Sequence, residues 1–467
     1  MPIAPSPHPI VTRFEDPFQE QYFRLFCNET SLACSGGWED PLWQIHILQA
    51  CHSEPCILQC AVAIAALDQA CRTSSIGLDT AESHHRYALQ HYGKALKSLQ
   101  EVTTRGKSTR TVLLASLLIY CFENFHGDSR LALTHVQSAL ELMSNWLAAT
   151  PRVSSSVGLS PSPHEIEDDL VSTLARLDIT VSTFLSGVDP LVGRLAKYTI
   201  SNNSTLTIPP VFMDVAEADR VWVHIMNRVF IFIAMAPRVM GLPKVARDKV
   251  MDGDGIQYTN TPVLEEIYAW QASFESILLH SRTPAGDKSF VRATMLRVLS
   301  VILSCAVRYA FFDRSKHHLT SVFLPEFCEI VALASSVIDH PSFIRGFVFE
   351  TAFIPSLFVV VVLCRDKMVR TEIIRIAKAM YPRREGVWDS AMLIKMGEEL
   401  LMAEESARDN LYRDEWVGTE LDSHSWTDAS APGDSTRSWL YPYPFSSGTK
   451  NTSDVNLSSV FCLRPIP

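Results

Sequence analysis

Ser53-Glu-Pro-Cys-Ile-Leu-Gln-Cys-Ala-Val-Ala-Ile-Ala-Ala-Leu67 is the stretch that decides the class of fold. Ser53 can cap a helix, and Pro55 then falls in the first turn, where its missing N–H costs nothing. From Cys56 to about Cys71 the helix would be apolar nearly all round, so we expect it to be buried. Convincing strands are absent from the rest of the sequence. We therefore expect other helices to pack around this buried helix.

Three helices follow this one at short intervals. Residues 80–103 are amphipathic, with apolar residues recurring at spacings of three and four. A wider apolar face marks a helix over about 109–125. Gly127 ends that helix, and Asp128 can cap the next one, Arg130–Leu147. Because the connecting turns are short, we expect these helices to be antiparallel neighbours.

Eight more helices are expected downstream, at about 164–185, 215–235, 263–280, 287–313, 322–340, 345–365, 367–380 and 389–407. The stretches 200–212 and 241–262 are rich in Pro, Gly, Asn and Asp and are expected to be loops. The sequence therefore predicts an all-α fold, an array of antiparallel helix pairs.

Composition changes along the chain predict its domain organisation. We expect an N-terminal helical array over 13–150, a Ser/Pro linker over 151–163, and a C-terminal helical part of the same domain over 164–410. Residues 1–12 are Pro-rich, and residues 411–467 are mostly Ser, Thr, Asp, Pro and Gly. Both ends of the chain are predicted to be largely disordered.

Composition and charge narrow the class of protein. Of the 467 residues 47% are hydrophobic and 20% are charged, as in ordinary globular proteins. The net charge of −10 repels phosphate, so the surface as a whole is not a nucleic-acid footprint. Met1–Pro7 has neither the basic nor the apolar region of a signal peptide. The most membrane-like stretch, Phe347–Cys364, contains Glu350 and Pro355, and we expect a buried helix there.

The cysteines indicate a reducing compartment, the cytosol or the nucleus. Their number is odd, their spacings are irregular, and several fall inside apolar helices, where a free thiol behaves as a small hydrophobe. We therefore expect no disulfide framework. The eleven are Cys27, Cys34, Cys51, Cys56, Cys60, Cys71, Cys121, Cys305, Cys328, Cys364 and Cys462.

Two clusters of metal-binding residue types occur in the first hundred residues. One is His46, Cys51, His52, Cys56 and Cys60, and the other is His84, His85 and His91. Zinc sites of small modules use two close pairs of ligands, and no C-x-x-C or H-E-x-x-H pattern is present. We interpret the first cluster as core packing and the second as a polar helix flank, and we predict no metal.

No nucleophile or phosphate-binding signature occurs, neither a G-x-S-x-G elbow nor a glycine-rich phosphate loop. We therefore expect no enzyme, no cofactor, and no catalytic, metal-binding or DNA-binding residue. The aromatic residues Phe230, Phe232, Phe311 and Phe312 are the candidates for a pocket that binds a small effector. Simple core packing is the favoured interpretation of these residues.

Four blocks of the sequence resemble the regulatory domain of fungal zinc-cluster transcription factors, which carry six cysteines in that cluster. The last block is the most specific, and the resemblance runs from about residue 20 to residue 405. The blocks are Pro41–Leu67, with Leu48-Gln-Ala-Cys-His-Ser-Glu-Pro55 inside it; His91-Tyr-Gly-Lys-Ala-Leu96; Leu113–Leu140; and Ile354–Ser390, which ends in Pro382-Arg-Arg-Glu-Gly-Val-Trp-Asp-Ser390.

The resemblance implies an all-helical domain that controls activation and partner contacts in the nucleus. In the family a zinc cluster precedes this domain, and no basic, cysteine-rich segment precedes it here. Cys27 and Cys34 have a spacing found in such clusters, but the residues between them include one acid and no base. The resemblance therefore implies that DNA is contacted only indirectly.

The leading hypothesis is a transcription regulator of a pathway-specific gene set, such as a secondary-metabolite gene cluster. It would act through other transcription factors or co-regulators, a zinc-cluster relative being one candidate partner, and not at a membrane. A small-molecule effector and a cytoplasmic pool are left open. One alternative is a non-transcriptional helical adaptor or effector-binding module. Another is that a zinc cluster is encoded upstream of the given start.

Overall fold

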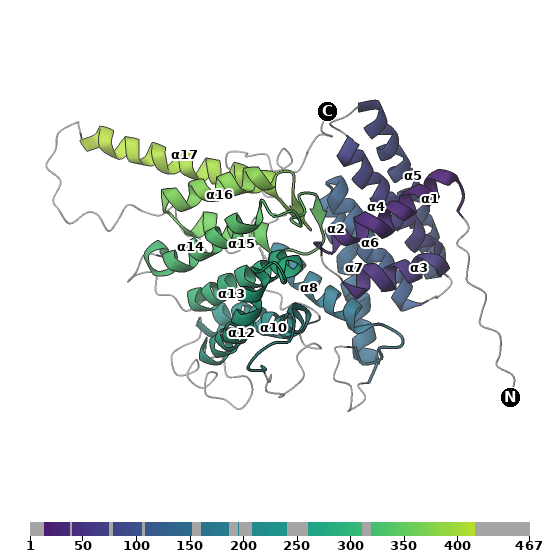
Figure 1. Cartoon of the computed structure of the whole chain (residues 1–467), viewed down its shortest axis with the longest axis horizontal. Coiled ribbons are helices and arrows are strands. Elements are labelled where there is room, and N and C mark those ends of the chain that lie inside the picture. Colours follow the sequence, from purple (N-terminus) through teal and green to yellow (C-terminus); the bar gives the residue numbers. More distant parts are fainter. Residues whose placement is uncertain are drawn as a thin grey trace. The chain divides into compact units, whose positions relative to one another are not determined.

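The computed structural model describes residues 14–37, 40–73, 78–104, 108–151, 160–185, 195, 208–240, 260–310 and 319–415. Helices form most of this part of the chain, together with three strands of two residues each, which confirms the predicted all-α class (Figure 1). The predicted disordered start, 1–12, lies outside the described residues, and so does the predicted tail from residue 416. The last helix continues to Glu415, so the first residues of the predicted tail are helical.

The described residues divide into two compact units. Unit 1 contains the residues up to Ala175 together with the short segment Phe347–Glu350. Unit 2 contains the residues from Arg176 to Gly346 and from Thr351 onward. The division falls within one continuous helix, α8 (Asp168–Leu185), and not at the predicted linker.

The end of the predicted 151–163 linker is packed. Ser160 and Ser162 are buried, and the Ser160 hydroxyl donates to the Ile166 carbonyl at 2.7 Å. The backbone N–H of Ser160 donates to the Asp168 carboxylate at 2.7 Å. These bonds fasten the segment to the start of α8. Residues 152–159 of the predicted linker lie outside the described part of the chain.

Unit 1 is organised around helix α4 (Pro55–Thr73), which packs against α1, α3, α5 and α6. Every residue from Cys56 to Leu67 is buried, as the uninterrupted apolar sequence predicts. Ser53 does not cap this helix, because it ends the preceding helix and its hydroxyl faces the Ala50 carbonyl at 3.4 Å. The other helices of the unit are α1 (Pro17–Leu25), η1 (Phe26–Thr30), α2 (Ser31–Cys34), η2 (Leu42–His46), α3 (Ile47–Ser53), α5 (Leu78–Thr104), α6 (Thr109–His126) and α7 (Ser129–Ala149).

The turn between α6 and α7 follows the predicted chemistry. Gly127 has φ 106°, a left-handed conformation that glycine adopts without a Cβ penalty, and it ends α6. Asp128 accepts a hydrogen bond from the backbone N–H of Leu131 at 2.9 Å and so caps α7. Both roles were expected from the sequence.

A segment from late in the sequence completes the core of unit 1. Phe347 and Val348 form strand β1, and the backbone N–H of Phe349 donates to the Cys34 carbonyl at 2.9 Å. The predicted helix over 345–365 is therefore wrong in its first turns. Helix α15 begins only at Phe353, because residues 347–350 are extended and pack into unit 1.

Unit 2 is a series of helices, each packed against its neighbours in the chain. Arg292, which is 6% exposed, pairs with Asp219, and Arg370, which is 2% exposed, pairs with Glu404 at 2.7 Å, so charged groups join α10 to α13 and α16 to α17. The bounds of the helices are α10 (Val215–Met240), α12 (Asn260–Ser281), η3 (Asp287–Ser289), α13 (Phe290–Ala310), α14 (Leu319–Val337), α15 (Phe353–Leu363), α16 (Lys367–Met380) and α17 (Ser390–Glu415).

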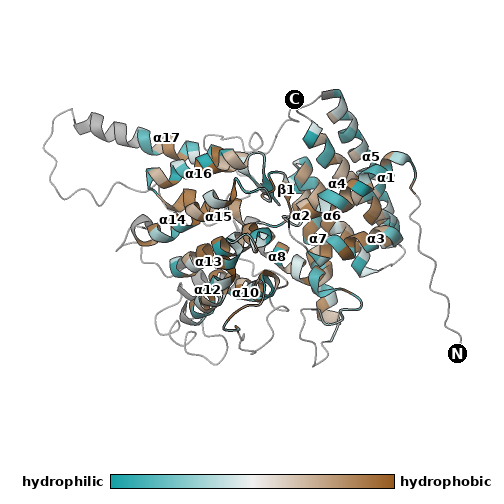
Figure 2. Cartoon of the chain, in the orientation of Figure 1, coloured by the Kyte–Doolittle hydropathy of each residue, from teal (hydrophilic) through white to brown (hydrophobic). Residues whose placement is uncertain are grey.

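The helices differ in how much apolar sequence they carry. Along α16 and α17 hydrophobic and hydrophilic residues alternate, as in helices with one solvated face, whereas α15 is predominantly hydrophobic (Figure 2). Two longer stretches, Pro55–Thr73 and Asp287–Tyr309, are long and apolar enough to cross a membrane. In these stretches 72% and 78% of the most apolar window is buried, which is typical of core helices in globular proteins.

Candidate functional site

The most specific sequence block, Pro382–Ser390, forms a tight hairpin before α17. Strand β2 (Arg384–Glu385) pairs antiparallel with β3 (Trp388–Asp389), and Glu385 lies opposite Trp388. Gly386 has φ 54°, which suits the first central position of a two-residue hairpin. The backbone N–H of Ser390 donates to the Arg383 carbonyl at 3.1 Å and closes the turn.

Glu385 connects this hairpin to the start of α15. One of its carboxylate oxygens accepts the backbone N–H groups of Ala352 and Ile354 at 2.9 and 3.0 Å. These are the donors that a helix leaves unsatisfied at its N-terminus, where a negative charge is also favoured. The side chain of Glu385 is fully buried, so the helix is capped by a carboxylate 31 residues downstream.

Arg383 neutralises the other oxygen of the same carboxylate. Its Nε lies 2.8 Å from Glu385 Oε1, and the guanidinium also donates to the Ile344 carbonyl. The guanidinium carbon lies 4.5 Å from the ring centroid of Phe343. Arg383 is 1% exposed, and the pair has its hydrogen-bonding partners in place. We call Arg383, Glu385 and the α15 start the hairpin clasp, and we infer that its role is to hold the fold.

An aromatic pocket in unit 1 receives the segment Phe347–Glu350. The Phe349 ring lies 5.7 Å from that of Trp43 and 5.8 Å from that of Tyr120, between ring centroids. Phe347 stacks on Phe125 at 5.3 Å with the rings 14° apart. Phe347 and Phe349 are 3% and 4% exposed, so the contacts resemble a protein core.

A polar network joins the N-terminus of the described chain to α4 and α5. Gln59 donates to the Glu15 carboxylate at 2.9 Å and is hydrogen-bonded to His91. Glu15 also pairs with Lys94, whose proximity lowers the pKa of that carboxyl. His91 is 1% exposed, and burial lowers its pKa. The network therefore holds a buried, hydrogen-bonded histidine between α4 and α5.

The predicted histidine cluster is thus divided among different contacts. His91 is buried and not part of a polar flank, which differs from the expectation, because Gln59 supplies its hydrogen bond. His84 is hydrogen-bonded to Tyr22, and His85 stacks on His126 with ring centroids 5.3 Å apart. Each of the three histidines therefore contacts a different partner, and they do not form one site.

In the predicted Cys/His cluster near residue 50 the thiols of Cys51, Cys56 and Cys60 lie near one another, but the histidines make other contacts. His46 faces the carboxylates of Glu167 and Asp169, each at 3.4 Å, and not the thiols. Cys51 and Cys60 are buried, and burial raises the pKa of both thiols. Within the described ranges no group of three or more His, Cys, Asp or Glu side chains has the geometry of a metal site.

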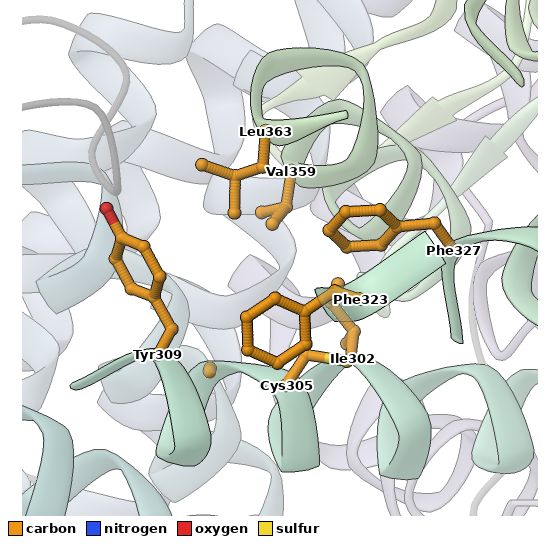
Figure 3. A pocket seen from close by; sticks show the side chains of 8 residues that line it. Ile302, Cys305, Tyr309, Phe323, Phe327, Val359 and Leu363 are labelled. Carbon is orange, nitrogen blue, oxygen red and sulfur yellow. The ribbon is translucent and has the colours of Figure 1, made fainter. Parts of the chain in front are cut away.

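A small apolar cavity lies inside unit 2, where α13, α14 and α15 meet (Figure 3). Its volume is about 20 Å³, enough for a group of one or two heavy atoms. The Tyr309 hydroxyl points away from the other labelled lining side chains (Figure 3). Burial raises the pKa of the Cys305 thiol to about 12, so the thiol is a poor nucleophile. The lining residues are Ile302, Cys305, Ala306, Tyr309, Phe323, Phe327, Val359 and Leu363.

Of the residues expected to line an effector pocket, Phe230 and Phe232 are not among the described residues that line this cavity. Phe232 is buried elsewhere, in α10, and Phe230 lies on the same helix. Phe311 and Phe312 lie outside the described residues. A helix over these residues was predicted, but the residues that face the cavity were not recognised. Ile302, Cys305 and Tyr309 are three and four residues apart, a spacing that places them on one face of α13.

Comparison with known protein families gives a match for the first part of the chain. Residues 18–196 match the family described as a fungal specific transcription factor domain. The match covers the first three sequence blocks, whereas the hairpin clasp lies outside the matched residues. No curated protein and no solved structure matches the chain significantly.

Proposed function

We propose, on the premise that residues 18–196 carry a fungal specific transcription factor domain, that this protein is a regulator of transcription for a pathway-specific gene set. The family match is the observation that supports the proposal. A secondary-metabolite gene cluster is the kind of target that we propose, and the nucleus is the proposed site of action. We also propose that the protein is not an enzyme.

Contacts with other proteins are the proposed mode of action. The net charge of −10 disfavours a broad contact with DNA phosphates. A helical scaffold with buried, fully paired polar groups such as the hairpin clasp can present a fixed surface to partners. The proposed partners are other transcription factors or co-regulators, among them a zinc-cluster protein.

A tethering assay tests the regulatory step by itself. The full chain is fused to an unrelated DNA-binding domain and placed at a reporter promoter in fungal cells. We expect reporter transcription to change several-fold relative to the DNA-binding domain alone. A fusion that is expressed, nuclear and without effect on the reporter would overturn the proposal.

Deletion of the gene tests the pathway step. We expect transcripts of a restricted gene set, and not of the whole genome, to change, and a fluorescent fusion to collect in the nucleus. The alternative, a helical adaptor outside transcription, predicts a cytosolic fusion and unchanged transcripts. A change confined to a few neighbouring genes would support a clustered pathway as the target.

A pull-down from the same cells tests the partner. We expect the full chain to recover a DNA-binding transcription factor, and recovery to fail when the hairpin clasp is broken by Glu385→Gln, because that change should unfold unit 2 locally. Recovery of no transcription factor by the intact chain would contradict action through partners while leaving the tethering result to stand.

A further inference from the structure

Helix α1 is fastened to α4 and α5 by polar side chains at its start. Glu15 accepts a hydrogen bond from Gln59 of α4 at 2.9 Å, and Asp16 accepts one from the Tyr87 hydroxyl of α5 at 3.0 Å. We call residues 15–25 the strap. Because hydrogen bonds of this kind depend on the protonation of the groups around them, pH can control how firmly the strap is held.

His91 lies next to these bonds, and their directions fix where it takes up a proton. Its ring is 1% exposed and stacks on Tyr87 with the centroids 4.3 Å apart. The Glu15 carboxylate can only accept, so the amide nitrogen of Gln59 faces it, and the amide oxygen faces His91 and requires a hydrogen on Nδ1. A further proton must therefore bind at Nε2, for which the described residues provide no hydrogen-bond partner.

A proton on Nε2 would place a charge in this buried position. Burial is the main cause of the lowered pKa of His91, and Lys94 lowers it further, whereas the two carboxylates before α1 oppose the shift. Carboxyl groups titrate at about pH 4, so both carboxylates stay ionised at pH 5.5 and the change between pH 7.5 and 5.5 belongs to the histidine. The groups around the ring are Glu15 and Asp16 before α1, Tyr22 in α1, Gln59 in α4, and Tyr87 and Lys94 in α5.

We propose that the strap is a pH-sensitive device, which detaches from α4 and α5 when His91 takes up a proton. In the open form water solvates the imidazolium, so that form binds a proton at the ordinary histidine pKa of about 6.5. Because the open form binds more protons than the closed form below that pH, acid favours opening, by at most about tenfold per pH unit. Opening exposes Tyr22 and Phe23, which are buried in the closed form, so the strap presents at acidic pH an apolar surface that it hides at neutral pH.

A second histidine that contacts the strap supplies the matched control. His84 of α5 is hydrogen-bonded through Nδ1 to the Tyr22 hydroxyl. A hydroxyl can donate to the neutral ring or accept from the protonated one, so this contact survives protonation. His84→Gln should therefore loosen the strap by the same factor at pH 7.5 and 5.5. His91→Gln, whose amide can still donate to Gln59, should instead remove the dependence on pH.

Backbone hydrogen exchange of the full chain, read by mass spectrometry and corrected for intrinsic rates, tests the proposal. The strap amides should be at least about tenfold less protected than those of α4, because the strap opens while α4 stays folded. Their protection should fall about three- to tenfold between pH 7.5 and 5.5. Equal protection of the strap and α4 would overturn the proposal. So would strap protection that is independent of pH, or a dependence that persists in His91→Gln.

Hydrogen exchange at the imidazole C2 carbon measures the ionisation of His91 directly and needs no variant. In the folded chain the midpoint of its titration should lie at a lower pH than in the chain unfolded by urea. An equal or higher midpoint in the folded chain would overturn the proposal, whatever the variants do.

Discussion

At the scale of single residues, the molecule depends most on Glu385. Its carboxylate caps α15 and neutralises Arg383, and both side chains are buried. A buried arginine that loses its partner leaves an uncompensated charge, which is far more costly than the loss of a surface pair. The block was recognisable in the sequence but its role was not, because the backbone donors at the start of α15 that bind Glu385 lie 31 and 33 residues away.

Glu385→Gln should therefore lower the free energy of unfolding of unit 2 by about 3–5 kcal/mol. The amide keeps the shape of the side chain but cannot neutralise Arg383. Urea unfolding followed by circular dichroism measures the change. Arg375→Ala, in an exposed ion pair with Glu372 at 2.7 Å, is the control and should leave the urea midpoint nearly unchanged. Equal losses in the two variants would show that the clasp is not held by its buried charges.

His91 gives unit 1 a dependence on pH. Burial is the main cause of its lowered pKa, the charge of Lys94 lowers it further, and Glu15 and Asp16 oppose the shift. In the unfolded chain the histidine has its ordinary pKa of about 6.5, so below that pH the unfolded state binds more protons than the folded state. Stability should therefore fall as the pH drops from about 7 to 5.5.

Thermal unfolding between pH 7.5 and 5.5 measures this loss, and His91→Gln should flatten the profile. Burial also lowers the pKa of His135, so part of the slope should remain in that variant. His164→Gln changes a side chain that is 82% exposed and should leave the profile unaltered. If the pH dependence of stability is the same in His91→Gln as in the unmodified chain, His91 is not the group that takes up the proton on unfolding.

At the scale of helices, the apolar periodicity was sufficient wherever a helix is specified by its own residues. The bounds of α4, α6 and α16 agree with the predictions within a few residues, and the Gly127–Asp128 turn was recognised from its chemistry. Prediction failed at α15, whose start is fixed by Glu385 and by the extended residues before it. The apolar run from Phe347 cannot distinguish a helix from a buried extended segment.

Gly93→Ala tests the balance between helix propensity and packing in α5. The new methyl group meets no atom within 4 Å, and alanine is the better helix former. The free energy of unfolding of unit 1 should rise by about 0.5–1 kcal/mol, measured by urea unfolding. A loss of stability would mean that the helix interior requires glycine for a reason within the chain.

At the scale of the whole molecule, the residues matched by the family do not coincide with the residues of either compact unit. The match ends at residue 196, whereas unit 1 includes Phe347–Glu350. The sequence could predict neither fact, since a four-residue segment carries no periodicity and its partners Trp43, Tyr120 and Phe125 are more than 200 residues away. The matched stretch alone therefore lacks part of its own core.

Phe349→Ala should destabilise unit 1 by about 3–5 kcal/mol, because a buried aromatic side chain leaves a cavity against Trp43 and Tyr120. Tryptophan fluorescence during urea unfolding measures the loss. Tyr381→Ala removes an aromatic side chain that is 51% exposed and serves as the control. The fragment 14–196 should unfold at lower urea than unit 1 in the full chain, and a synthetic peptide spanning 343–353 should restore part of the difference.

The segment Phe347–Glu350 also sets an order of events during synthesis. About 170 residues separate Ala175 from Phe347 in the chain. At cellular elongation rates the ribosome needs on the order of 10–30 seconds to make them. During that interval the nascent unit 1 presents Trp43, Tyr120 and Phe125 without their cover. The core of unit 1 can therefore be completed only after residues 347–350 have been made.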